Sequence, residues 1–202
     1  MWIAFLDSSV LFPVFISNLL LFLSKAELFE TRWSSDVHRE WIESRLRRFP
    51  DADRAALERK RARMDAEFPD ALVEGYESSI NEFDLPDPDD RHVAAAADRA
   101  GANVIVTDNV DDFPSDKLSR GMFAQTADDF IADQVYLTGK SPRLVAIALI
   151  RHKKGLTTSR PNWRQYFQQL KARLPQTYGL VNDPAFRSTM ADVLLSGDWR
   201  HE

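Results

Sequence analysis

Four aspartates crowd one short segment of the chain, and further acidic residues follow the next apolar run. Residues 84–90 read Asp-Leu-Pro-Asp-Pro-Asp-Asp, and residues 107–112 read Thr-Asp-Asn-Val-Asp-Asp, directly after the apolar run at 104–106. Carboxylates gathered at one point repel one another, and a divalent cation relieves that repulsion. Because Mg²⁺ and Mn²⁺ prefer oxygen ligands, the pattern predicts a site for one of these metals. Such a metal can activate water and stabilise charge on a phosphoryl oxygen, which matches phosphodiester hydrolysis.

Two earlier acidic residues lie where the edge of a sheet could collect them. Asp7 follows the short apolar run at residues 2–6, and Glu40 lies on a helix expected to begin near residue 34. The predicted metal-binding and catalytic residues are Asp7, Glu40, Asp90 and either Asp108 or Asp112.

Each of these residues also has an ordinary structural interpretation. Asp7 could cap a helix, and Glu40 could be a solvated helix residue. The aspartates before residue 91 could cap the following helix and complement its dipole, and residues 111–112 could form a turn. The hypothesis therefore depends on the conjunction of the acidic residues and on their order along the chain.

Composition narrows the class of protein. The 202 residues are 44% hydrophobic, which allows one domain, or one domain with a small appendage. The absence of cysteine excludes disulfides, Fe–S clusters and thiolate zinc, and it favours a reducing, cytoplasmic location. We expect the apolar run at residues 10–23 to be a buried helix with no role in a membrane, because it is short and interrupted by Ser17 and Asn18.

Expected strands and helices alternate up to residue 137. Strands are expected at residues 2–6, 29–33, 71–76 and 104–106, and helices at 10–23, 34–49, 50–67, 91–100 and 126–136. This alternation predicts an α/β fold with a central parallel sheet, whose ligand sites lie at the carboxyl ends of the strands. Three more helices, at 142–153, 161–174 and 184–196, predict a small C-terminal helical appendage.

The order of these motifs resembles a PIN domain, the nuclease fold of VapC-type toxins. The matching segments are residues 5–11, 33–40, 85–97 and 104–114. The resemblance implies a three-layer α/β/α sandwich over residues 1–137 and Mg²⁺- or Mn²⁺-dependent cleavage of an RNA substrate, leaving 5′-phosphate and 3′-hydroxyl ends. It also implies a cognate antitoxin protein that blocks the site, and a possible homodimer.

The resemblance assigns roles to individual positions. Asp7, Glu40 and Asp90 match the first three acidic ligands of the family, and Asp108 competes with Asp112 for the fourth, because families differ there. Thr107 would donate a hydrogen bond to a ligand carboxylate. The implied supporting residues around the ligands are Asp87, Asp89, Thr107 and Asn109, while His92 is expected to be structural.

Residues 138–202 form the expected extension beyond the PIN-like domain, and they resemble the C-terminal extension of one larger subgroup of these toxins. Residues 134–182 contain nine Lys or Arg and no acidic residue, so a polyanion such as RNA is the expected partner. The predicted RNA-binding residues are Arg143, Arg151, Lys153, Lys154, Arg160 and Arg164. The nearby aromatic residues could stack on bases, or they could pack the extension onto the body of the protein.

Two other functions remain as alternatives. The chain could be a catalytically inactive PIN-like module that binds RNA or protein, which predicts weak metal affinity. A phosphatase with a nucleophilic Asp7 would need a second aspartate two residues later, where the chain has Ser9.

Overall fold

A computed structural model describes residues 1–137 and 142–200 of the chain. Contacts group the chain into two compact units, Met1–Ser17 with Glu30–Thr126, and Asn18–Phe29 with Ala127–Glu202. This grouping differs from the division at residues 137 and 138 expected from the sequence. Residue 138 itself lies outside the described residues.

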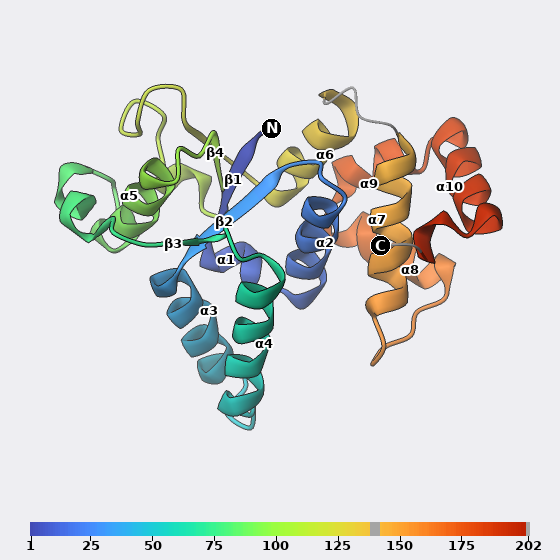
Figure 1. Cartoon of the computed structure of the whole chain (residues 1–202), viewed down its shortest axis with the longest axis horizontal. Helices are drawn as coiled ribbons and strands as arrows, with labels where there is room; N and C mark the ends of the chain where they lie inside the picture. The colour runs from blue at the N-terminus through green and yellow to red at the C-terminus, as the bar shows by residue number, and fades with distance from the viewer. Residues whose placement is uncertain (138–141, 201–202) are drawn as a thin grey trace. The chain divides into compact units, whose positions relative to one another are not determined.

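The first unit contains a sheet of five parallel strands in the order β3-β2-β1-β4-β5 (Figure 1). The strands are β1 (Ile3–Leu6), β2 (Glu30–Ser34), β3 (Leu72–Val73), β4 (Val104–Val106) and β5 (Phe123–Gln125). In the central pair, Phe5 of β1 lies opposite Ile105 of β4. The predicted α/β fold with a parallel sheet is therefore confirmed, and β5 is a strand that the sequence did not predict.

The order in which the strands are added to the sheet reverses beside β1. The chain builds outward from β1 through β2 to β3 and then returns to β4 on the other side of β1. All five carboxyl ends lie at one edge, and ligand sites of such sheets lie where the strand order reverses. Asp7 directly follows β1 and Thr107 directly follows β4, so both lie at that reversal.

The central strands are buried along their whole apolar length. Phe5 and Leu6 in β1 and Val104–Val106 in β4 have no exposed surface, as expected for parallel strands covered on both faces. Helix α5 (Arg91–Arg99) buries its run of alanines, Ala94–Ala97. Because alanine side chains are small, the backbone of α5 can pack closely against its neighbours.

The N-terminal helices begin and end at local signals in the sequence. They are α1 (Ser8–Leu11), α2 (Val14–Lys25), α3 (Ser35–Arg48) and α4 (Arg54–Glu67). The helix predicted over residues 10–23 is divided in two, because Pro13 has no N–H to continue the hydrogen-bond ladder of α1. Helix α4 begins at residue 54 and not at residue 50, because the Asp53 side chain caps it through Ala55 N at 2.9 Å. Among the described helices, none has the length and apolar content needed to cross a membrane.

A buried hydrogen-bond network joins β2, α3 and α4. Trp41 Nε1 donates to His38 Nδ1 at 2.9 Å, so the hydrogen of the neutral ring lies on Nε2, 3.0 Å from Asp65 Oδ1. Trp33 Nε1 donates to the same Asp65 oxygen at 2.9 Å. Burial lowers the pKa of His38 below its ordinary value, so the stability that this neutral histidine contributes is lost as pH falls through the lowered pKa.

The second unit is helical. It contains residues 18–25 of α2 together with α6 (Ala127–Leu137), α7 (Pro142–Gly155), α8 (Trp163–Arg173), α9 (Pro175–Val181) and α10 (Pro184–Ser196). Three of these helices were predicted in the extension, and α9 was not. A side chain on α6 caps α9, since the Asp128 carboxylate accepts hydrogen bonds from Gln176 N at 2.8 Å and Thr177 N at 2.9 Å.

We expect Asp128→Ala to lower the free energy of unfolding by about 2 kcal/mol, because it removes two hydrogen bonds to a charged, buried acceptor. The matched control is Asp192→Ala, which removes an exposed carboxylate from α10. Urea unfolding followed by circular dichroism measures both variants. Equal stability of the two variants would show that the Asp128 cap contributes nothing.

Candidate functional site

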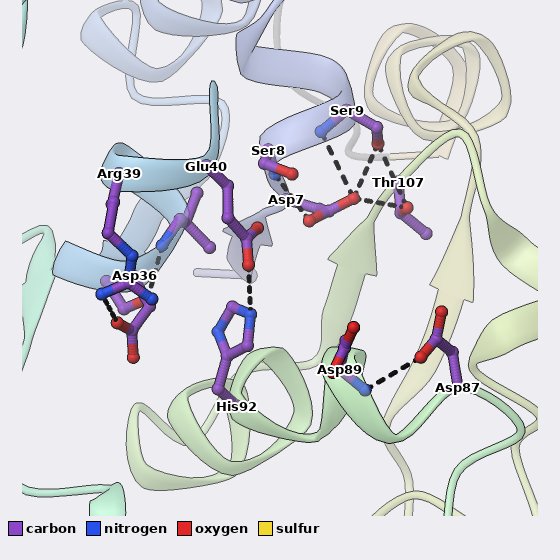
Figure 2. A network of polar contacts seen from close by, with 12 residues as sticks. Asp7, Ser8, Ser9, Asp36, Arg39, Glu40, Asp87, Asp89, His92 and Thr107 are labelled. Atoms are coloured by element: carbon purple, nitrogen blue, oxygen red, sulfur yellow. Dashed lines mark hydrogen bonds and ion pairs between the residues drawn. The ribbon is translucent and has the colours of Figure 1, made fainter. Parts of the chain in front are cut away.

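Asp7 lies at the carboxyl end of the central strand and is held by donors on both carboxylate oxygens (Figure 2). Its Oδ1 accepts from Ser8 N at 2.6 Å, and its Oδ2 accepts from the hydroxyls of Ser9 at 2.7 Å and Thr107 at 2.8 Å. The side chain also caps α1 and is only 4% exposed. Asp7 therefore acts as a helix cap, as its structural alternative predicted, and its carboxylate is also fixed at the sheet edge.

Thr107 and Ser9 tie the loop after β4 to the start of α1. Their hydroxyl oxygens are 3.2 Å apart, and Asp108 N donates to Ser9 Oγ at 2.9 Å. Asn109 N donates to Thr107 Oγ1 at 3.1 Å. The predicted hydrogen bond from Thr107 to Asp7 is thus confirmed, and Ser9 is a member of the site that the sequence analysis did not identify.

Glu40 projects from α3 toward α5 and meets His92 there. The two side chains approach at 2.6 Å between Glu40 Oε1 and His92 Nε2 (Figure 2). Burial alone would lower the pKa of His92, but the bond and charge of Glu40 raise it above its ordinary value. His92 was expected to be structural, and the structure places it against a candidate ligand.

Asp90 lies at the start of α5 and makes no capping hydrogen bond. Burial, followed by the negative charges of Asp7, Asp87, Asp112 and Glu40, raises the pKa of Asp90 to about 7. Residues far apart in the sequence therefore act on one carboxylate. The alternative role, capping, belongs to Asp87, which accepts a hydrogen bond from Asp89 N at 2.9 Å in the 3₁₀ turn before α5.

Asp108 and Asp112 both lie at the site, but they interact with different carboxylates: Asp108 with Asp7, and Asp112 with Asp90. Partial burial and the charge of Asp7 raise the pKa of Asp108 above its ordinary value. Asp112 ends a 3₁₀ turn, as the turn alternative predicted, and its charge contributes to the raised pKa of Asp90. Both residues are therefore candidates for the fourth ligand.

The donor set fits a hard divalent cation in its chemistry, since it contains only carboxylate oxygens and their charges repel one another at Asp90. The acidic side chains are farther apart than the ligands of a bound metal ion. Within the part of the chain that the structure describes, no three acidic or histidine side chains are close enough to hold a metal. Binding would therefore require a change in the side-chain positions, while Asp7 is already fixed by its four donors.

The chain was compared with protein-family models, with curated proteins and with solved structures. None of them matches it. The function of the site is therefore inferred from its own residues and their contacts.

Two of the predicted RNA-binding residues hold the C-terminal end of the chain in place. Arg143 forms an ion pair with Asp198, and Arg151 Nε donates to the carbonyl oxygen of Trp199 at 3.0 Å. Both arginines lie on α7 and join it to the 3₁₀ turn at Asp198–Arg200. This role is structural, and their contact with RNA stays a prediction.

The other predicted RNA-binding residues lie close to aromatic rings or line a groove. Lys153 and Lys154 lie over the rings of Trp163 and Trp199, with Nζ 5.2 and 5.1 Å from the ring centres. Arg160 donates to a backbone carbonyl, and exposed Arg164 lines a groove of about 570 Å³ that is shared by α8, α9 and α10. Among the neighbouring aromatics, Tyr166 is fully buried, whereas Trp163 is half-buried at this groove.

We expect Thr107→Val to weaken Mn²⁺ binding about tenfold, because the hydroxyl that orients the carboxylate of Asp7, a predicted ligand, is lost without a change in charge. Thr107→Ser, which keeps the hydroxyl, is the matched control and should bind Mn²⁺ almost as the wild type does. Isothermal titration calorimetry measures both affinities. Equal weakening in the two variants would contradict this account, because Thr107→Ser keeps the hydroxyl that bonds Asp7.

Proposed function

We propose that the chain is a Mg²⁺- or Mn²⁺-dependent endoribonuclease with a PIN-like three-layer α/β/α sandwich. It would act as the toxin of a pair whose cognate antitoxin blocks the site. The observation that carries the proposal is the group formed by Asp90 and the carboxylates around it. Burial, followed by the charges of Asp7, Asp87, Asp112 and Glu40, raises the pKa of Asp90 to about 7. This group lies at the carboxyl edge of the parallel sheet, where ligands of such sheets bind.

The residues of the site have separate tasks in this proposal. Asp7, Glu40 and Asp90, with Asp108 or Asp112, would hold the cation, which supplies an activated water and stabilises charge on a phosphoryl oxygen. Ser9 and Thr107 fix the orientation of Asp7, and His92 fixes Glu40. Water would attack the phosphorus in line and leave 5′-phosphate and 3′-hydroxyl ends.

The test is incubation of the purified protein with mixed RNA that includes tRNA, in Mg²⁺ or Mn²⁺, with EDTA as control. Cleavage that requires the metal and yields 5′-phosphate ends is the expected result. Cleavage that continues in EDTA would contradict the proposal, as would the absence of any Mn²⁺ binding. In cells, induced synthesis should arrest growth, and Asp7→Asn should relieve the arrest.

A second candidate function is a PIN-like module that binds RNA or protein without cutting it. It is favoured by the spacing of the acidic side chains, since no three of them converge among the described residues. It is also favoured by the close pairing of Glu40 with His92. This module would bind RNA equally well in EDTA and would show no metal-induced rise in melting temperature.

A further inference from the structure

One face of α3 continues from the acidic site to a pair of arginines. Counted from Glu40, positions four, seven and eight residues later on α3 are Ser44, Arg47 and Arg48. These spacings place the four residues on one side of the helix. Glu40 belongs to the site through its contact with His92. The two arginines lie in the last turn of α3 and are exposed.

The same face borders a groove of about 500 Å³ in the first unit. The lining residues are Ser8, Ser9, Phe12, Ser44, Arg47 and Arg48. Two of them, Ser8 and Ser9, donate hydrogen bonds to the Asp7 carboxylate. The groove is therefore lined at one point by two residues that bond the Asp7 carboxylate of the proposed metal site.

The charge of this groove is opposite to that of the adjacent site. Its lining contains no acidic residue. Arg47 donates to Ser44 Oγ at 2.8 Å, and the Arg48 guanidinium lies 5.5 Å from the ring centre of Phe49. Across the described ranges 1–137 and 142–200, neither arginine has a carboxylate within salt-bridge distance, so both guanidinium groups can take an external anion.

We propose that this groove binds the sugar–phosphate backbone of an RNA strand next to the bond that is cleaved, an inference that rests on the proposed function. Guanidinium groups and serine hydroxyls are typical donors to phosphate oxygens, and the half-buried ring of Phe12 offers a surface for a base. An anionic strand would be repelled by the carboxylates alone. The arginines offset that repulsion and direct the strand along α3 toward Asp7.

The test compares Arg47→Gln/Arg48→Gln with Arg59→Gln/Arg63→Gln, which removes the same charge from exposed positions on α4 outside this groove. Binding of a labelled single-stranded RNA is measured in EDTA by fluorescence anisotropy over a range of salt concentrations. We expect the first variant to bind about tenfold more weakly at low salt. Its log–log salt dependence should be shallower by about 1.4, the value for two phosphate contacts to a single strand. Where the wild type cleaves, KM should rise about tenfold with kcat within twofold.

The outcomes separate this inference from the proposed function. Loss of RNA binding only in the Arg47/Arg48 variant supports the groove, whether or not the wild type cleaves RNA. Equal binding by both variants, or no RNA binding by the wild type, overturns the groove even if metal-dependent cleavage is found. Stronger competition by an acidic peptide of 15 residues than by RNA of equal charge would also overturn it, and would assign the groove to a protein partner.

Discussion

Asp90→Asn should lower RNA cleavage at least about 100-fold and at the same time raise the melting temperature of the protein in EDTA at pH 8. The two effects share one cause. At pH 8 the Asp90 carboxylate is ionised although it is partly buried and lies near four other carboxylates, which opposes folding and would favour cation binding. A neutral amide removes the repulsion and also removes the negative charge that a cation requires.

The pH dependence of this stabilisation has a definite sign. The pKa of Asp90 in the folded protein is about 7, above the ordinary value of 3.8. The destabilisation due to Asp90 is therefore fully developed above pH 7 and disappears as pH falls toward 3.8. After allowance for solvent screening we expect a gain of about 1 kcal/mol at pH 8, equivalent to about 3 °C. Differential scanning fluorimetry at pH 8 and at pH 4.5 measures the gain and its loss.

Asp111→Asn is the matched control for Asp90→Asn, since Asp111 is exposed and is not among the residues whose charges raise the pKa of Asp90. The control should change neither cleavage nor melting temperature appreciably. Mn²⁺ should raise the melting temperature of the wild type and the control, but not that of Asp90→Asn. A lower melting temperature for Asp90→Asn at pH 8 would contradict the electrostatic account of the site.

Asp65→Leu should reduce the free energy of unfolding by about 3 to 4 kcal/mol, which corresponds to roughly 10 °C in melting temperature. Leucine cannot accept the hydrogen bonds that Asp65 takes from Trp33 Nε1 and His38 Nε2. Both donors would then be buried without a partner, since Trp33 and His38 have no exposed surface. The melting temperature at pH 7.5 is the measurement.

Asp65→Asn is the informative control for this network, because its amide oxygen can accept both hydrogen bonds at a similar position. We expect it to lose about 1 kcal/mol, the difference between a charged and a neutral acceptor. If the leucine and asparagine variants had the same melting temperature, the two hydrogen bonds would not be the source of the stability.

The sequence predicted the elements whose signals are local. The strands at Ile3–Leu6 and Val104–Val106 are continuous apolar runs, and α5 carries its own stop signal in Gly101, which has φ 63°. Strand β5 lacks such a signal, because Phe123–Gln125 is short and half-buried throughout. Helix α9 has a start signal in its first residue, Pro175, but it is only seven residues long and its capping side chain, Asp128, lies 47 residues earlier.

The candidate site shows the same limit. The acidic residues could be identified from their order along the chain, because Asp7 and Asp108 follow strands, Asp90 stands at the start of α5, and Glu40 lies inside α3. Their hydrogen-bond partners come from segments far away in the sequence, so nothing in the sequence indicated that Glu40 pairs with His92. Ser9 could have been identified, since a serine two residues after the aspartate that ends a strand is placed to bond that aspartate. The spacing of Ser44 and Arg47 behind Glu40 was equally visible in the sequence.

Helix α2 belongs to both units, and this limits how the chain can be shortened. Residues 14–17 group with the sheet and residues 18–25 with the C-terminal helices. Phe22 of this helix lies 6.1 Å from His152, ring centre to ring centre, and a Cβ at Gly155 would stand 3.3 Å from the Phe22 ring. A polypeptide ending at residue 137 would retain Phe22 without these neighbours. A cut at residue 137 therefore does not separate the two units, because residues 18–25 of α2 would be left without the C-terminal helices with which they group.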